Sequence, residues 1–95
     1  MTPPARLSAA ITLLDLVLSG DPAERALTRW ARASRFAGSK DRAAVRDIVF
    51  DVLRRKRSLA HIGGSMTGRA LVLAQQFVAG AALDELFGEI RFAPE

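Results

Sequence analysis

A chain of 95 residues with 49% hydrophobic and 25% charged residues has the balance of one small globular domain, and it is too apolar for an intrinsically disordered chain. It contains no Cys, which excludes disulfides, thiolate metal sites and a cysteine nucleophile. No apolar run approaches the roughly 20 residues of a membrane span, and Asp15 interrupts the apolar stretch 9–18, which argues against a signal peptide. We therefore expect a soluble, cytoplasmic protein with a single domain, residues 1–95.

The charge is distributed unevenly along the chain. The formal net charge is +4, but residues 24–69 contain twelve Lys and Arg against four Asp and Glu, a local net charge of +8. The remaining residues contain two basic against six acidic side chains, a net charge of −4. A concentrated positive field of this kind favours polyanions as partners.

The first predicted helix runs from about Pro4, which a first turn tolerates, to Gly20, a typical C-terminal glycine. Apolar residues recur along it at helical spacing and form one stripe, namely Leu7, Ala10, Ile11, Leu14, Val17 and Leu18. The spacing predicts that this stripe faces the core.

The second predicted helix begins after Asp21, which we expect to be its N-cap, with Pro22 and Glu24 in the first turn. Trp30 lies on its apolar face, and we expect it to be a buried core anchor. The opposite face is basic and carries Arg25, Arg29 and Arg32. The segment "FAGSK" that follows is predicted to be a loop.

The third predicted helix is long, from about Lys40 to Ile62, with Ser39 as its N-cap. Its inner face is expected to bury Val45, Ile48, Val49, Val52, Leu53, Leu59 and Ala60. Lys40 and Arg42 are slightly unfavourable in a first turn, because the helix dipole is positive there. Either an ion pair to another helix or an anionic partner would account for them.

Two more helices are predicted after the glycine-rich segment "GGSMTG", residues 63–68. This segment lacks the lysine and spacing of a phosphate-binding loop and is predicted to be an interhelical turn. The fourth helix starts near Thr67, with Leu71, Ala74, Phe77 and Val78 on its apolar face. "AALDELF", residues 81–87, is expected to be a short fifth helix, and residues 88–95 an irregular tail that suggests a chain continuing into something longer.

The basic run Arg54-Arg55-Lys56-Arg57 cannot form one patch on a straight helix, because neighbouring residues are 100° apart. The helical positions predict that Arg55 pairs with Asp51 and that Lys56 lies toward the packed side. Arg54 and Arg57 should be accessible and form a stripe opposite the core, whose other members are Arg46, Phe50 and His61. Phe50 either packs under a neighbouring helix or belongs to a surface on which bases stack. His61, the only histidine, is expected to be structural or superficial.

The segment "RFAGSKDRAAVRDIVFDVLRRKRSLAHIGG" resembles the N-terminal NusB-like domain of the RsmB/Sun family of bacterial rRNA cytosine-5 methyltransferases. The shared pattern is a G-S-x-D-R-A start, an aliphatic run with one aromatic, a basic stretch and an aliphatic close; "LDLVLSGDPAERALTRWARASR" is similar to the preceding helices. The resemblance implies an all-α, NusB-like bundle of about five helices that binds or positions RNA. It also implies that a catalytic domain using S-adenosylmethionine follows in the same polypeptide.

The expected function is therefore a non-catalytic, RNA-binding domain of a 16S rRNA (cytosine-C5) methyltransferase, without a cofactor or metal of its own. Two alternatives remain open, a module that docks on the catalytic domain and a free NusB-type transcription antitermination factor. A helix-turn-helix DNA reader fits less well, because the third predicted helix is long and no short turn joins a pair of short helices. The candidate phosphate-binding residues are Arg25, Arg29, Arg32, Arg35, Lys40, Arg42, Arg46, Arg54 and Arg57.

Overall fold

The computed structural model describes residues 1–80, which form five helices and no strand. The helices are α1 (Pro3–Leu18), α2 (Ala23–Ala33), α3 (Ser39–Arg54), α4 (Lys56–Gly63) and α5 (Gly68–Val78). The predicted all-α bundle of about five helices is confirmed. The five helices are not the five that were predicted. The expected third helix is divided into α3 and α4, and the expected helix at 81–87 and the tail at 88–95 lie outside the described residues.

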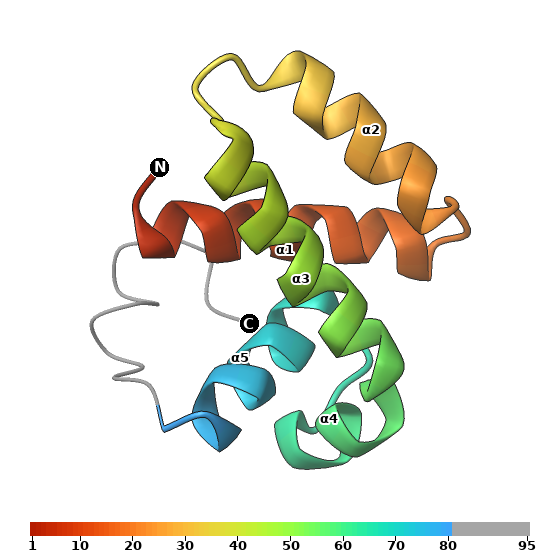
Figure 1. Ribbon diagram of the computed structural model, residues 1–95. Helices are drawn as coiled ribbons and strands as arrows, with labels where there is room; N and C mark the ends of the chain where they lie inside the picture. Colours follow the sequence, from red (N-terminus) through yellow and green to blue (C-terminus); the bar gives the residue numbers. More distant parts are fainter. Residues whose placement is uncertain (81–95) are drawn as a thin grey trace.

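The first helix is the centre of the bundle. It packs against α2, α3 and α5, while α4 packs chiefly against α5. Figure 1 shows α3 crossing α1, with α2 on one side of the crossing and the pair α4 and α5 on the other. This arrangement gives α2 one main support, α1, and leaves much of its surface open.

The core consists of aliphatic side chains from every helix. The predicted inner face of α3 is confirmed at Val45, Val49 and Val52, which are fully buried, whereas Ile48 and Leu53 are only partly buried against the core. The three valines meet a large set of equally buried side chains, including Ile11, Leu14, Leu59, Leu71 and Val72. Burying a side chain of this kind stabilises the fold by about 1.5–3 kcal/mol each.

The two predicted N-caps that precede α2 and α3 are wrong by one residue. Pro22 occupies the N-cap position of α2, and the Asp21 carboxylate instead lies 3.5 Å from the Arg29 guanidinium. Gly38, rather than Ser39, is the N-cap of α3. The Asp41 carboxylate accepts a hydrogen bond from the Gly38 N–H at 3.1 Å, so a side chain inside the helix binds the backbone of its N-cap residue.

The long helix expected between residues 40 and 62 is interrupted at Arg55. The backbone there has φ −115° and ψ 20°, outside the α-helical region, and α4 restarts at Lys56. The interruption lets α4 pack against α5 and bury Leu59, which is 1% exposed. A straight helix of that length would run roughly 35 Å and exceed the longest extent of the molecule, 32 Å.

The turn between α4 and α5 has the form expected from its glycines. Gly64 ends α4 in the left-handed conformation with φ 80°, and Thr67 caps α5 by accepting a hydrogen bond from the Ala70 N–H. The apolar face predicted for the following helix is correct only in part. Leu71 and Ala74 are buried, but the last turn of α5, Phe77 and Val78, is mostly exposed because no other described helix covers it.

Candidate nucleic-acid interface

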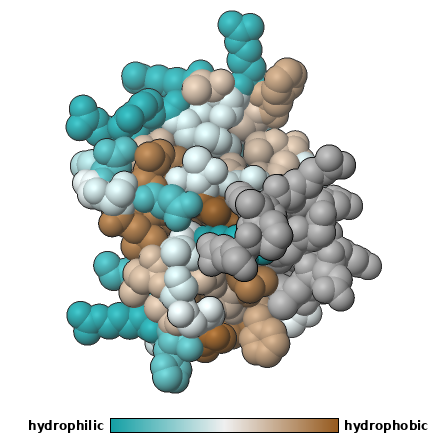
Figure 2. Space-filling model, turned by 180° about the vertical axis from the view of Figure 1, so that it is seen from behind, coloured by the Kyte–Doolittle hydropathy of each residue, from teal (hydrophilic) through white to brown (hydrophobic). Residues whose placement is uncertain are grey.

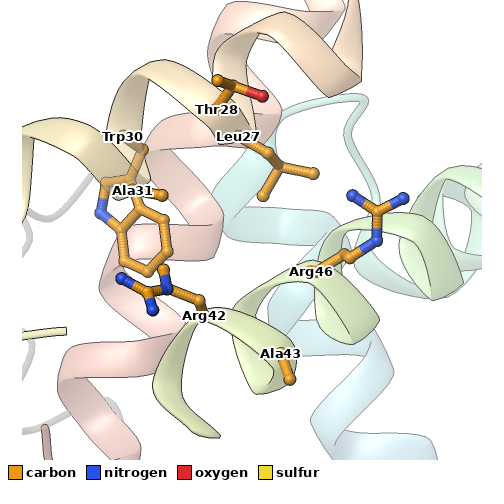
Figure 3. A pocket seen from close by; sticks show the side chains of 7 residues that line it. All are labelled: Leu27, Thr28, Trp30, Ala31, Arg42, Ala43 and Arg46. Carbon is orange, nitrogen blue, oxygen red and sulfur yellow. The ribbon is translucent and has the colours of Figure 1, made fainter. Parts of the chain in front are cut away.

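A groove of about 220 Å³ separates α2 from α3. Both helices rest on α1 and their backbones approach each other little, although the Arg46 side chain of α3 binds Glu24 of α2. Its walls come from both helices, with Leu27, Thr28, Trp30 and Ala31 on one side and Arg42, Ala43 and Arg46 on the other (Figure 3). The groove is therefore apolar at its base and basic along the α3 side.

Trp30 is only partly buried, so the prediction of a buried core anchor was half right. The indole packs against the core cluster and also lines the groove. Figure 3 shows the indole of Trp30 and the guanidinium of Arg42 pointing toward one another from the two helices. Trp30 and Arg42 thus line the same groove from the two helices.

The outer face of α2 is basic, as predicted. Arg25, Arg29 and Arg32 are exposed and line one shallow hollow together with Glu24 and Thr28. Thr28 lines both this hollow and the groove, so the two features form one continuous surface. In Figure 2, where the molecule is seen from behind, hydrophilic side chains project at the upper left, on the side of α2.

The first turn of α3 presents its basic side chains outward and its acid inward. Lys40 and Arg42 are exposed, whereas Asp41 is 8% exposed. The Asp41 carboxylate accepts hydrogen bonds from Arg6 at 2.9 Å and from the Gly38 N–H, and the N-terminal ammonium of Met1 lies 3.3 Å away. The bond from Arg6, followed by that from Gly38, lowers the pKa of Asp41 to about 2. The one acidic side chain of this turn is thus buried, and its negative charge is balanced by Arg6 and the N-terminal ammonium.

Neither Lys40 nor Arg42 forms an ion pair with another residue in the range 1–80. The Arg42 guanidinium lies 3.5 Å from the carbonyl oxygen of Ala37, a long contact. Of the two explanations considered for basic residues at this helix start, the intramolecular ion pair is absent from the described part of the chain.

Arg46 is exposed but engaged. Its guanidinium donates to both carboxylate oxygens of Glu24 on α2, one of them at 3.1 Å, and lies 4.8 Å from the centre of the Phe50 ring. The hydrogen bond from Arg46 lowers the pKa of Glu24, and the same bond raises the pKa of Arg46. Phe50 is half-buried against the core beneath this arginine, in agreement with the packing alternative for that residue.

The basic run is divided between two helices. Arg55 pairs with Asp51 at 2.6 Å, as predicted, and Arg54 pairs with the other oxygen of Asp51 at 2.9 Å. Lys56 is exposed, so its predicted position toward the packed side is wrong, because α4 restarts with a new direction at that residue. Arg54 and Arg57 are accessible, also as predicted, but their stripe with Arg46 is interrupted at Arg55.

All nine candidate residues are exposed, but they fall into two groups. One group surrounds the groove or the adjacent end of α3, namely Arg25, Arg29, Arg32, Arg35, Lys40, Arg42 and Arg46. The other, Arg54 and Arg57, lies at the junction of α3 and α4. Six of the nine have no ion pair with any residue in the described range, and these are Arg25, Arg32, Arg35, Lys40, Arg42 and Arg57.

Sequence reasoning missed Phe36, which is 92% exposed in the loop between α2 and α3. A solvated aromatic side chain between Arg35 and Lys40 is a common feature of surfaces that stack nucleic-acid bases. The sequence could have predicted this exposure, because Phe36 lies in a predicted loop and therefore belongs to no helix face that packs on the core. Thr28 was also missed, because its role as a link between the hollow and the groove depends on the packing of α2 against α1.

Other kinds of site find little support within residues 1–80. No group of three His, Cys, Asp or Glu side chains there could hold a metal ion, and His61 is exposed. None of the five helices is both long and apolar enough to cross a membrane.

Comparisons with known proteins identified no relative of this chain. No family model matches the chain, and neither a curated protein nor a solved structure matches it. The interface is therefore characterised by its own geometry: an aromatic-lined groove, a basic helix face and a helix start whose acid is turned inward.

Proposed function

We propose that this domain binds structured RNA through the phosphate backbone, using the outer face of α2 and the first turn of α3. The observation that carries the proposal is the set of exposed cations around the groove that have no carboxylate partner within residues 1–80. Unpaired surface cations repel one another, and an approaching polyanion relieves that repulsion while releasing its own counterions. The resemblance to the NusB-like domain of rRNA cytosine-5 methyltransferases supports the same partner.

In this proposal the chain itself performs no catalysis. It holds an rRNA substrate for a catalytic domain of the same polypeptide, where S-adenosylmethionine would bind. Residues 1–80 contain no strand leading into a glycine-rich loop, so they offer no nucleotide-binding turn for that cofactor. Separately, the sequence has no Cys for covalent attack on cytosine. The action of the domain is therefore binding and orientation.

A salt titration of RNA binding tests the proposal. Replacing Arg25 and Arg32 together with Gln should weaken binding to any structured RNA about equally and lower the slope of log affinity against log salt by roughly 1.4–1.8. Arg55→Gln is the matched control, because Arg55 is already bound to Asp51 and should leave the slope unchanged. Identical slopes for wild type, double variant and control would reject the phosphate role of α2.

A second function is favoured by a separate observation. An apolar groove of about 240 Å³ between α4 and α5 is lined by Ile62, Gly63, Leu73, Ala74 and Phe77. Ile62 and Phe77 are each at least half exposed, and apolar side chains grouped in this way often mark protein contacts. The sequence pointed to the basic face for a module that docks on the catalytic domain, whereas this apolar face offers a second surface for the same docking. Ile62→Lys should abolish such docking and leave RNA binding unchanged.

A further inference from the structure

The groove between α2 and α3 has the size and lining of a site for one flat ring. Its volume of about 220 Å³ is below the roughly 300–1,000 Å³ of pockets that enclose a whole small molecule. The wall formed by Trp30 is held in place, because part of the indole packs against the core. A preorganised aromatic wall gains more on stacking than a mobile one, since less rotamer freedom is lost on binding.

The charges at the groove restrict what the ring can be attached to. Arg42 lines the groove without an ion-pair partner in residues 1–80, and Arg25, Arg29 and Arg32 lie on the adjoining surface beyond Thr28. Glu24 is bonded to Arg46 and Asp21 lies against Arg29, so the cations left without an ion pair in residues 1–80 near such a ring are Arg42, Arg25 and Arg32. A nucleotide satisfies both conditions, because its base is flat and its phosphate is anionic.

A base inside a duplex cannot enter this groove, because both of its faces are already covered by neighbouring bases. Sequence-specific RNA recognition mostly uses loops, bulges and ends, where bases are free to stack on aromatic side chains. The groove therefore distinguishes unpaired from paired RNA, whereas the basic face of α2 does not.

We propose that the groove between α2 and α3 holds one unpaired RNA base stacked on the indole of Trp30, with Arg42 at the neighbouring phosphate. This inference rests on the proposed function and deepens it from RNA in general to RNA with an unpaired nucleotide. It assigns Trp30 a role beyond packing and gives the domain a preference that charge alone would not produce.

Trp30 is the only tryptophan of the chain, so its fluorescence reports on the groove and on the space against α1 that the indole also lines. The full 95-residue chain is titrated with an RNA hairpin that has an unpaired loop, with a blunt RNA duplex of equal length and with a mononucleotide. Quenching by the hairpin, with little by the duplex, is the expected result. Equal quenching by the duplex would overturn the inference, and so would saturable binding of the mononucleotide as tight as that of the hairpin.

Two variants separate the groove from the charged face. Ala31→Leu fills the groove without changing charge and should weaken hairpin binding on the order of 5- to 100-fold, the loss that corresponds to one stacked base, while duplex binding is unchanged. Ala33→Leu is the comparison variant, because Ala33 is exposed on α2 and lines the other space that Trp30 borders, against α1. The pair of variants therefore shows on which side of the indole a base stacks. Binding of both RNAs is measured by anisotropy, and thermal unfolding verifies that each variant is folded.

Trp30→Phe should retain most of the hairpin preference and Trp30→Leu should lose it, since only the former keeps an aromatic face. If Ala31→Leu and Ala33→Leu both behave like the wild type, the groove holds no base. If the hairpin and the duplex bind equally, with a salt slope that Arg25 and Arg32 control, only this inference fails and the proposed function stands. If the slope does not depend on those arginines, the proposed function fails as well.

Discussion

The start of α5 lies so close to α1 that it has room only for glycine. A Cβ atom on Gly68 would lie 2.5 Å from the carbonyl oxygen of Ile11 and 2.8 Å from Oδ1 of Asp15. The same Asp15 oxygen accepts a hydrogen bond from the Gly68 N–H at 2.8 Å, which caps α5 across the two helices. Gly68→Ala is therefore a sharp test of how α5 docks on α1.

The expected cost follows from these contacts. The Ile11 carbonyl belongs to a helix and cannot turn away, so α5 must shift, which costs typically 1–3 kcal/mol in a packed region. The shift also weakens the bond to Asp15, with a further loss of about 1 kcal/mol, whereas alanine's better helix propensity returns at most about 1 kcal/mol. A net loss of about 2 kcal/mol should lower Tm by roughly 8–16 °C in a domain of this size.

Thermal unfolding followed by circular dichroism measures this effect. Gly38→Ala is the matched control, because its φ of −75° suits alanine and its added Cβ would meet only Asp41 Oδ2 at 3.8 Å, an ordinary contact. That variant should change stability by less than about 1 kcal/mol. If Gly68→Ala melts with the wild type, the close approach of α5 to α1 is wrong.

Three further predictions concern charge and ligands. The hydrogen bonds from Gln75 and then Arg55 lower the pKa of Asp51 to about 2, below the roughly 3.9 of an unfolded chain. The stability that Asp51 contributes is therefore complete above about pH 4 and is lost as the pH falls toward 2. Chemical denaturation should show Asp51→Asn losing less stability across that window than the wild type, and equal losses would contradict the assignment. Glu24→Gln should release Arg46 and steepen the salt slope of RNA binding by up to about 0.9, whereas an unchanged slope would show that Arg46 reaches no phosphate. Calorimetry should find no saturable binding of S-adenosylmethionine to the chain, and saturation at micromolar cofactor would refute the non-catalytic role.

Periodicity in the sequence predicted the inner faces of the helices well. The spacing of Val45, Val49 and Val52 is enough to place them on one side of α3, and all three are fully buried. The same reasoning placed six basic candidates away from the core, and all six are exposed: Arg25, Arg29, Arg32, Arg46, Arg54 and Arg57. Burial follows from a local pattern in these cases, because an amphipathic helix has only one face that can enter a core.

The interruption at Arg55 could not be predicted in this way. Neither Gly nor Pro marks it, and arginine and lysine are good helix formers, so the local signal favours a continuous helix. The advantage of the break is tertiary, since it lets α4 pack on α5 and bury Leu59. The bond between Arg46 and Glu24 was equally hidden, because it joins residues 22 positions apart whose proximity depends on how α2 and α3 rest on α1.

The break also explains why the densest basic segment is not the strongest candidate for RNA contact. Arg54 and Arg55 both bind the Asp51 carboxylate, which also accepts a hydrogen bond from Gln75 of α5 at 2.7 Å. Arg54 and Arg55 therefore belong to the contact that holds α3 against α5. Of the two candidate phosphate-binding residues in this run, Arg54 and Arg57, only Arg57 has no ion pair in the described range. Replacing Arg54 and Arg57 together should remove about one phosphate contact, a slope change of roughly 0.7–0.9, against two for the pair on α2. A larger change for the Arg54 and Arg57 pair than for Arg25 and Arg32 would move the interface from the groove to the junction of α3 and α4.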